Sequence, residues 1–423
     1  MPRSRPRRET EPAGFRPTHA AVHYDEIALK GKNRPWFERR LAENAKRALA
    51  AAAWPGASAE RLYGRLLVDP GEPNRAGVGL REAAGVLARV FGVAHVLPVR
   101  RVEPRLEALS EAACESVAGA ESVETFAVKC RRATKEFPFD SMDVQRAVGA
   151  AVKARTGWRV DLDDPDCTLR IDCVGGTTLL GFVPIPGPGG LPTGVAGKVA
   201  CLISGGIDSP VAAHRMLRRG ATAVYVHFES SPYTGAESQE KAAALVGIVQ
   251  PPGFRARLHY VPFGELQRKI AARCAARLRV LLYRRFMLRA AEAIARREGA
   301  IALVTGESLG QVSSQTLENL RAIDAVAALP VLRPLIGMDK LEIVREAQRI
   351  GTFETSIEPH ADCCSFLQPP NPATRADPEE LEAEEAHLDV AAEVEALVAA
   401  ARSIEVAPCE RRLGEARAPG GGA

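Results

Sequence analysis

One short segment combines residue types that can hold a phosphate group. It reads Ser204-Gly205-Gly206-Ile207-Asp208-Ser209 and follows an apolar run from Val199 to Ile203. Two glycines let the backbone turn tightly and bring its N–H groups close to an anion. A helix predicted to begin near Ser209 adds its positive N-terminal end. A Gly-Gly pair alone is also typical of structural turns, but the full pattern after an apolar strand favours phosphate binding.

Asp208 is the unexpected member of this segment, because a carboxylate repels a phosphate. A cation between the two groups would remove the conflict, so we assign Asp208 to Mg²⁺. No Gly-Lys-Ser or Gly-Lys-Thr follows, which excludes a Walker A loop. The pattern therefore predicts a magnesium–phosphate site of another kind.

Adjacent cysteines, Cys363 and Cys364, can carry sulfur. They precede a proline-rich loop, so we expect them to be accessible. A thiolate at this position can hold sulfur as a persulfide. Two alternatives stay open: a pair of buried thiols, and a zinc site with His360, for which no second ligand group is spaced nearby. Most of the nine cysteines stand in apolar runs, but Cys409 is outside them and is a candidate resolving thiol.

A basic run with aromatic residues suits RNA. Arg131, Arg132 and Lys135 precede Phe137 and Phe139, so cations can meet phosphates while a ring stacks on a base. The alternative is an ordinary solvated loop. A similar but weaker pattern contains Lys30, Lys32 and Arg34.

The elements that position these residues alternate between strands and helices. In the second half of the chain, short apolar runs are separated by helical patterns, the longest being Glu265 to Arg297, which favours a buried parallel sheet. The strands expected there are Val199–Ile203, Ala223–Phe228, Arg257–Pro262 and Ala300–Thr305. In the first half, strands and helices also alternate, and Thr168–Val174 and Thr178–Pro184 form an expected hairpin around Gly175-Gly176.

The phosphate-binding segment resembles the PP-loop of ATP pyrophosphatases, enzymes that split ATP into AMP and pyrophosphate and adenylate a carbonyl oxygen. Four further segments resemble the tRNA uridine 4-sulfurtransferase (ThiI) family, and they occur in order over about residues 19 to 375. They are Tyr24–Asn33, Lys129–Pro138, Thr305–Thr316, and the stretch from Arg333-Pro334-Leu335-Ile336-Gly337 to Asp362-Cys363-Cys364.

This resemblance implies a nucleotide site and its residues. His227 and Phe228 would contact the adenosine, and Arg284 the phosphates or ribose, although the neighbouring Arg285 leaves that assignment open by one position. For His227 alone, a buried core histidine is the simpler interpretation. The implied ATP-binding residues are Leu202, Ile203, Ser204, Gly205, Gly206, Asp208, Ser209, His227, Phe228, Arg284, Gly306 and Gln315.

The resemblance also implies a reaction. ATP and Mg²⁺ bind the loop, O4 of the uridine at position eight of tRNA is adenylated, and a persulfide on Cys364, with Cys363 beside it, replaces the oxygen to give 4-thiouridine. A cysteine desulfurase would supply the persulfide, and a homodimer is left open. About 45 residues follow Asp377, too few for the rhodanese domain of longer members, so we expect the short form. Sulfur transfer to the thiamine-pathway carrier protein is doubtful in such a form.

The expected fold is α/β: a PP-loop ATP pyrophosphatase domain with a parallel, Rossmann-like sheet, preceded by ferredoxin-like and THUMP α+β domains. The expected boundaries are a disordered basic arm over 1–18, the ferredoxin-like domain over 19–78, the THUMP RNA-binding domain over 79–184, a linker over 185–197, the PP-loop domain over 198–376 and an acidic tail over 377–423.

Composition supports a polyanionic partner. The net charge of +4 divides into −8 over residues 377–423 and +12 over the remainder. No apolar run approaches the ~20 residues of a membrane span, and the N-terminus lacks the apolar segment of a secretory signal. We therefore expect a cytoplasmic protein with reduced thiols. Two rival functions remain at this stage: an ATP pyrophosphatase that amidates a carbonyl with ammonia, and a tRNA-binding protein without catalysis.

Overall fold

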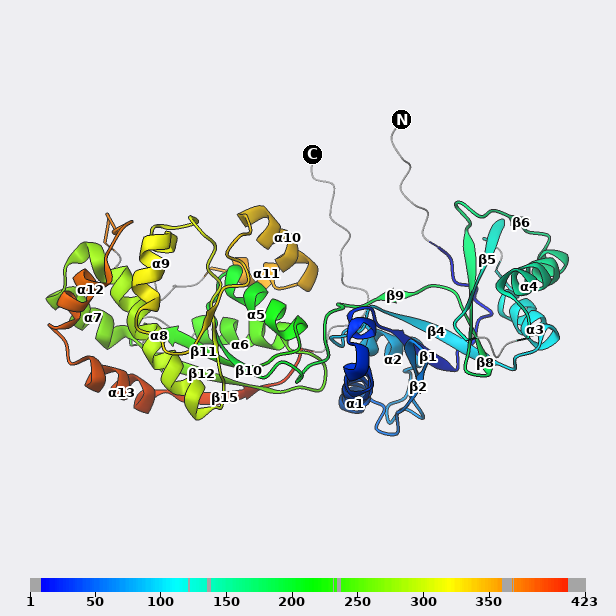
Figure 1. Cartoon of the computed structure of the whole chain (residues 1–423), viewed down its shortest axis with the longest axis horizontal. Coiled ribbons are helices and arrows are strands. Elements are labelled where there is room, and N and C mark those ends of the chain that lie inside the picture. Colours follow the sequence, from blue (N-terminus) through cyan, green and yellow to red (C-terminus); the bar gives the residue numbers. More distant parts are fainter. Residues whose placement is uncertain are drawn as a thin grey trace, which may run out of the picture. The chain divides into compact units, whose positions relative to one another are not determined.

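The chain forms two compact units in the computed structural model (Figure 1). The structure describes residues 9–120, 122–134, 138–230, 232–233, 237–359, 367 and 369–409. The division falls between Pro192 and Thr193, inside the predicted linker. Within the described residues, no helix is long and apolar enough to cross a bilayer.

The first unit is built on one mixed sheet of nine strands over its described residues. Its order is β2-β3-β1-β4-β8-β7-β5-β6, with β9 also paired to β4. Most neighbours are antiparallel, but β5 runs parallel to β6 and β7. The strands are β1 (His19–His23), β2 (Ser58–Leu62), β3 (Arg65–Asp69), β4 (His95–Val102), β5 (Thr125–Arg132), β6 (Arg159–Val160), β7 (Cys167–Val174), β8 (Thr177–Gly181) and β9 (Ile185–Pro186).

Two pairs of helices cover this sheet, and each pair forms a core of its own with it. The first core joins α1 (Arg34–Ala52) and α2 (Leu80–Leu87) to β1 and β3, and the second joins α3 (Leu106–Ser116) and α4 (Ser141–Thr156) to β5 and β7. Short 3-10 turns, η1 (Glu26–Leu29) and η2 (Gly31–Asn33), precede α1. Because α2 shares its core with α1, the boundary expected at 78/79 cuts through a packed region.

The residues before β1 also differ from the expected disordered arm. Residues 1–8 lie outside the described part, but Phe15 is 1% exposed and packs in the second core. The Glu9 carboxylate lies 2.8 Å from the Arg170 guanidinium on β7. A buried aromatic ring and an ion pair therefore hold the described residues before β1 in the first unit, although the arginines of the N-terminal region had predicted a disordered arm.

The predicted hairpin of β7 and β8 is present. Val174 pairs with Thr177 in an antiparallel register, and Gly175 and Gly176 have φ angles of +55° and +72°. Two consecutive positive φ angles are what a tight two-residue hairpin turn requires, and glycine adopts them without strain.

The second unit is an α/β layer structure. Its sheet has the order β14-β13-β10-β11-β12-β15, parallel except for β15, which is antiparallel to β12. The strands are β10 (Lys198–Leu202), β11 (Thr222–Glu229), β12 (Ala256–Pro262), β13 (Leu303–Val304), β14 (Val331–Leu332) and β15 (Arg402–Val406). After β12 the chain returns to the far side of β10, which creates a switch point in strand order between β10 and β13. Ligand sites of open α/β sheets occur at such points.

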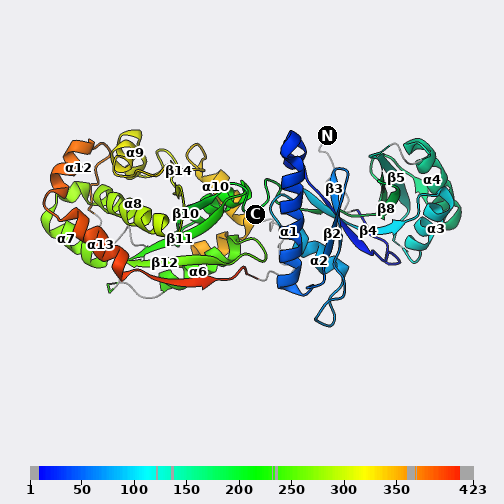
Figure 2. The ribbon, with the colours of Figure 1, turned by 60° about the horizontal axis from the view of Figure 1, so that its bottom comes forward.

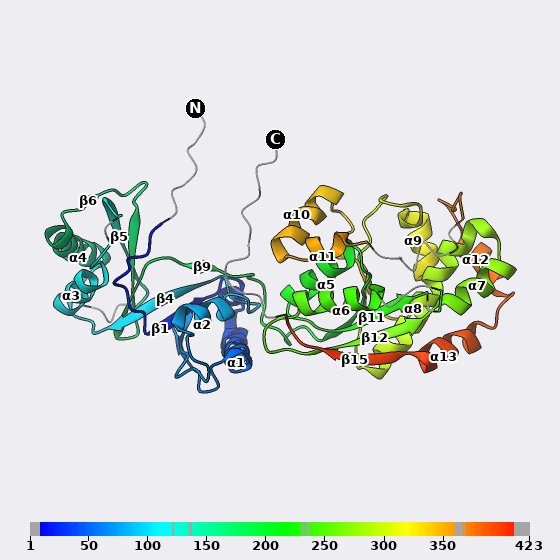
Figure 3. The ribbon, with the colours of Figure 1, turned by 180° about the vertical axis from the view of Figure 1, so that it is seen from behind.

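Helices cover both faces of this sheet. Figure 2 shows α8 (Arg279–Arg297) and α6 (Glu237–Val249) on opposite sides of β11 and β12. Figure 3 shows α5 (Asp208–Arg218), α10 (Lys340–Ile350) and α11 (Phe353–Ile357) gathered near α6. The remaining elements are α7 (Gly264–Arg273), η3 (Ala276–Leu278), η4 (Ser313–Gln315), α9 (Leu317–Asp324), α12 (Pro378–Glu385) and α13 (Val390–Ala400).

The described part of the segment expected as an acidic tail, residues 377–409, is an integral part of this unit. Leu381, Leu388 and Leu397 lie in the same core as α8, and β15 extends the sheet beyond β12. Glu385 is 4% exposed. Its charge is paired inside the unit, which a count of acidic residues cannot reveal.

The long helical pattern from Glu265 to Arg297 is interrupted. It forms α7, the turn η3 and α8, with extended backbone at Cys274. The Ala275 N–H at this break donates to Glu384 Oε2 at 2.8 Å. A carboxylate from α12 thus satisfies a backbone donor that a continuous helix would have used.

Candidate active site

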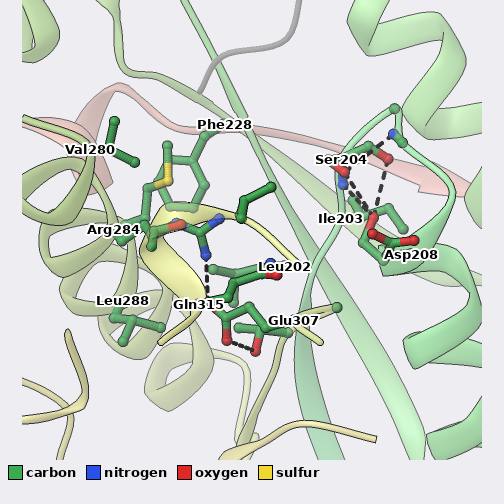
Figure 4. A pocket seen from close by; sticks show the side chains of 18 of the residues that line it. Leu202, Ile203, Ser204, Asp208, Phe228, Val280, Arg284, Leu288, Glu307 and Gln315 are labelled. Atoms are coloured by element: carbon green, nitrogen blue, oxygen red, sulfur yellow. Dashed lines mark hydrogen bonds and ion pairs between the residues drawn. The ribbon is translucent and has the colours of Figure 1, made fainter. Parts of the chain in front are cut away.

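The Ser-Gly-Gly segment forms a tight loop between β10 and α5 (Figure 4). The backbone N–H of Ser204 donates to Ser209 Oγ at 2.8 Å, and the two hydroxyl oxygens lie 3.1 Å apart. The Gly206 N–H donates to Ser204 Oγ at 3.3 Å. These bonds tie the start of the loop to the first turn of α5, whose positive end faces the loop.

Gly306 closes the loop from the other side of the switch point. A Cβ atom at this position would stand 2.7 Å from the Ser209 nitrogen and 2.9 Å from the Asp208 carbonyl carbon. Any side chain would therefore push the segment after β13 away from α5. Glycine is required here by close packing of two backbones rather than by its φ angle.

Asp208 has two partners that the sequence did not indicate. Lys340 Nζ lies 2.6 Å from Asp208 Oδ1, and Gln311 Nε2 donates to Asp208 Oδ2 at 2.9 Å. Lys340 is the first residue of α10, just after the N-cap residue Asp339. The lysine stands only three residues beyond the Arg333–Gly337 motif, so its proximity to that motif was the available signal.

His227 bonds to the backbone just before the loop. Its Nδ1 lies 2.9 Å from the Ile203 carbonyl oxygen and its Nε2 lies 3.0 Å from Ser238 Oγ. Because a carbonyl only accepts, Nδ1 carries the proton and Nε2 accepts from the serine. The ring is 4% exposed. Both nitrogens therefore serve the protein, which favours a positioning role, while the neighbouring Phe228 packs edge-on against Phe263.

The two adjacent arginines of α8 have different surroundings. Arg284 lines the cavity and lies 2.5 Å from Glu307 Oε1. Arg285 is 1% exposed and donates two bonds of 2.8 Å to the Glu385 carboxylate, which Arg289 also contacts. Arg284 is therefore the candidate ligand residue, and Arg285 joins α8 to α12.

Glu307 is a second residue that the sequence did not single out individually. Thr305 Oγ1 donates to it at 2.7 Å and Arg333 Nε at 2.5 Å, in addition to Arg284. Burial acts to raise the pKa of Glu307, but the Arg284 and Arg333 guanidiniums outweigh it and hold that pKa below its usual value. The carboxylate stays ionised and fixes both arginines.

These elements enclose a cavity of about 410 Å³. That volume lies within the range of ligand pockets. Three of the residues that line it each carry a buried polar atom without a hydrogen-bond partner: Arg284 Nε, Gln311 Oε1 and Gln315 Oε1. Unsatisfied buried groups are rare in native proteins and here point to a polar ligand. The predicted residues that line the cavity are Leu202, Ile203, Ser204, Gly205, Gly206, Asp208, Ser209, His227, Phe228, Arg284, Gly306 and Gln315.

The predicted sulfur carriers Cys363 and Cys364 lie outside the described residues. Burial raises the pKa of Cys167 to about 12 and that of Cys274 to about 11, so neither thiol ionises readily. Cys409 is exposed, and its N–H donates to the Gly247 carbonyl.

The predicted RNA-binding cations of the first unit are not equally available. Arg132 donates to the carbonyl oxygens of Thr134 and Phe139, and Lys30 forms an ion pair with Glu26 at 3.2 Å. Arg131, at the end of β5, and Lys32 are exposed. Lys135 lies outside the described residues.

Comparison with known proteins agrees with this architecture. A profile of the family described as "Thiamine biosynthesis protein (ThiI)" matches residues 194–390. Profiles described as "THUMP domain" and "ThiI ferredoxin-like domain" match residues 103–183 and 19–96. The predicted fold class is thereby confirmed.

Full-length relatives and a solved structure extend the agreement to most of the chain. The chain is 45% identical over 396 residues to the "Probable tRNA sulfurtransferase" of Thermus thermophilus, covering 92% of each protein. It is 43% identical over 366 residues to the protein of the same name from Caldanaerobacter subterraneus, covering 86% of this chain and 94% of that one. A crystallised 4-thiouridine synthetase in complex with RNA and bound ATP matches with a TM-score of 0.82 and 35% identity, over 92% of this chain and 100% of that chain.

An α/β nucleotide-site unit linked to a THUMP-containing unit defines a class of RNA-modifying enzymes. Within that class, the chain belongs to the tRNA sulfurtransferase family, as its motifs predicted.

Proposed function

We propose that this enzyme uses ATP to replace O4 of uridine 8 in tRNA by sulfur, giving 4-thiouridine. Membership of the tRNA sulfurtransferase family and the likeness to a 4-thiouridine synthetase with bound ATP support this function. The observation that carries it is the cavity at the switch point, which is lined by the Ser-Gly-Gly loop and by three residues that each carry an unsatisfied buried polar atom.

ATP fits this cavity in one orientation. The loop N–H groups and the positive end of α5 suit the phosphates. The opposite wall carries Phe228, Val280, Met287 and Leu288, which suit an adenine ring. The guanidinium group of Arg284 can donate to ribose or phosphate oxygens, and the amide group of Gln315 can accept from a hydroxyl or an amino group.

Magnesium fits the phosphate end through Asp208. One carboxylate together with nucleotide phosphates is a common way for proteins to hold Mg²⁺, and the ion would neutralise charge on the leaving pyrophosphate. Lys340, 2.6 Å from Asp208 Oδ1, is placed to exchange that contact for a phosphate oxygen.

The reaction proceeds in two stages. Uridine O4 attacks the α-phosphorus, an O4–P bond forms, the bond between the α- and β-phosphates breaks, and pyrophosphate leaves as N3 loses its proton. The terminal sulfur of a Cys364 persulfide then attacks C4, and AMP leaves with the original oxygen. The base is now joined to Cys364 through a disulfide.

A second thiol completes the transfer. It attacks Cys364 Sγ, breaks the disulfide and releases 4-thiouridine after reprotonation of N3. The product disulfide joins Cys364 to Cys409 or to an external thiol, and an added thiol reductant must return it to the reduced state. We infer that a cysteine desulfurase supplies the next sulfur atom, and that the exposed cations Arg131 and Lys32 of the first unit bind tRNA phosphates.

Nucleoside analysis tests this function. The purified chain is incubated with unmodified tRNA, ATP, Mg²⁺, a cysteine desulfurase with cysteine, and a thiol reductant, and the digested tRNA is examined by mass spectrometry. We expect 4-thiouridine at position eight, with one pyrophosphate released per sulfur incorporated. Modified tRNA that carries an amino group instead of sulfur would point to amidation, and unmodified tRNA after tight binding would point to a protein without catalysis.

A further inference from the structure

Helix α6 contacts both the nucleotide loop and the segment that leads to the cysteines. Ser238, near its start, bonds to His227, which in turn bonds to the Ile203 carbonyl. Lys241, one turn further along α6, bonds to the end of α11: its Nζ donates to the carbonyl oxygens of Ser356 at 2.8 Å and Glu358 at 2.6 Å. Figure 3 shows α6 beside α11.

A third contact closes this arrangement into a circuit. Ser356 Oγ donates to the Gly206 carbonyl oxygen at 3.3 Å. The end of α11 therefore bonds directly to the nucleotide loop through Ser356 and to α6 through Lys241. Helix α6 is linked to the residue before the loop, Ile203, only through His227.

A lysine as buried as Lys241 is unusual in a structural contact. It is 5% exposed, and burial of an ammonium group is costly unless its donors are satisfied. Its acceptors are carbonyls at the C-terminal end of a helix, which lack partners within the helix and carry partial negative charge. Glu237, Glu240 and Glu358 line the groove beside it.

The bonds from Lys241 fix where the cysteine-bearing segment begins. Glu358 ends α11 in an extended conformation, with φ −58° and ψ 137°. Cys364 follows six residues later, a stretch that reaches at most about 20 Å. The bonds of Lys241 and Ser356 thereby fix the point from which the chain leads toward Cys364.

We propose that Lys241 is a positioning residue for sulfur delivery, which anchors the base of the Cys364 segment to the nucleotide loop. The proposal rests on the proposed function and on Cys364 as sulfur carrier. Lys241 does not line the nucleotide cavity, so it should affect the sulfur-transfer stage and leave adenylation intact.

The test compares two sulfur sources in Lys241→Met. Sulfide in excess can attack the adenylated base without a carrier, whereas the desulfurase route needs Cys364 to reach it. We expect unchanged tRNA-dependent pyrophosphate release, unchanged sulfide-driven thiolation, and a desulfurase-driven kcat lowered about tenfold or more at constant KM for tRNA. Lys241→Arg, which keeps a cationic donor, should restore part of the desulfurase-driven rate.

Control variants separate positioning from general damage. Lys269→Met removes another lysine of the same unit, one that pairs with Glu393 and is 40% exposed, and should change none of the three rates. If Lys241→Met does not fold, as judged by its melting curve, Lys241→Gln retains one amide donor and gives the same comparison.

Equal loss of pyrophosphate release and of both thiolation rates would overturn the proposal, as would an unchanged desulfurase-driven rate. Absence of 4-thiouridine with the parent enzyme would instead refute the proposed function, and full activity of Cys364→Ser would refute the carrier.

Discussion

In the second unit, the predicted polar residues converge, although they come from β10, β11, α8 and the segment after β13. In the first unit, the predicted cations differ in their availability: Arg132 and Lys30 bond to groups of their own unit, while Arg131 and Lys32 are exposed. A parallel sheet brings the carboxyl ends of its strands to one edge, so residues at those ends meet whatever their spacing. No comparable rule brings together the residues of a binding surface. Whether each cation is available to RNA depends on the protein groups that bond to it.

The largest effect should come from the phosphate end of the cavity. Asp208→Ala is expected to lower thiolation by about 10²- to 10³-fold, because the Mg²⁺ ion that would neutralise the pyrophosphate loses its carboxylate ligand. Binding of tRNA, measured by filter retention, should remain near that of the parent if the first unit holds the RNA. Glu393→Gln, which removes a carboxylate of the same unit away from the cavity, is the matched control. An equal loss of tRNA binding in Asp208→Ala would contradict the assignment of ATP binding to the second unit and tRNA binding to the first.

The adjacent arginines of α8 offer a second contrast. Arg285→Met should lower the free energy of unfolding by about 3 kcal/mol, because it breaks a buried ion pair and leaves Glu385 with Arg289 alone. Arg284→Met should lower stability less, because Arg284 is more exposed than Arg285 and Arg333 still bonds to Glu307. It should raise KM for ATP about tenfold, the cost of one charged hydrogen bond. Thermal melts and pyrophosphate-release kinetics on both variants check this. The reverse pattern would exchange their roles.

The first unit should show a pH dependence of its own. Burial, together with His95, Arg65 and Arg131, lowers the pKa of His23 to about 3. Below pH 6.5 the unfolded chain therefore takes up a proton that the folded unit does not, so stability falls as pH falls. From pH 7 to pH 5 this contribution is about 2 kcal/mol.

The measurement is the melting temperature between pH 7 and pH 5. His23→Gln should be less stable than the parent at pH 7 but should show a shallower loss on acidification. His387→Gln, at an exposed site in the second unit, should keep the parent slope. Identical slopes for His23→Gln and the parent would mean that other groups cause the acid sensitivity.

The smallest effect distinguishes neighbouring cations of the first unit. If Arg131 neutralises a tRNA phosphate, Arg131→Ala should reduce the slope of log affinity against log salt by about 0.7. Arg132→Ala should leave that slope unchanged and lower thermal stability, because Arg132 bonds to the carbonyls of Thr134 and Phe139. Equal slopes for both variants would count against phosphate binding by Arg131 and would favour the alternative of an ordinary solvated segment.

The sequence allowed prediction of what depends on neighbours along the chain. The loop from Ser204 to Ser209 and the Gly175-Gly176 hairpin are local, since each needs particular residues at adjacent positions. Lys340 and Glu307 escaped attention because their roles depend on contacts with Asp208 and Arg284 from distant segments. Proximity of this kind is decided by strand order.

The segment around α12 is another case in which contacts between distant residues could not be predicted from the sequence. An acidic composition predicted a tail outside the PP-loop domain, and a continuous helical pattern predicted one long helix. Both expectations failed at α12, where Glu384 bonds to the break before α8 and Glu385 pairs with Arg285. An acidic side chain is solvated only if no cation or N–H group approaches it, and a single sequence does not show that approach.

The position of β15 bears on how the protein is made. This strand pairs with β12, yet it is synthesised about 140 residues later. While the ribosome works through the intervening residues, β12 keeps an unpaired edge, and such edges recruit strands from other chains. Nascent chains stalled before residue 402 should therefore engage chaperones more strongly than chains released after residue 406.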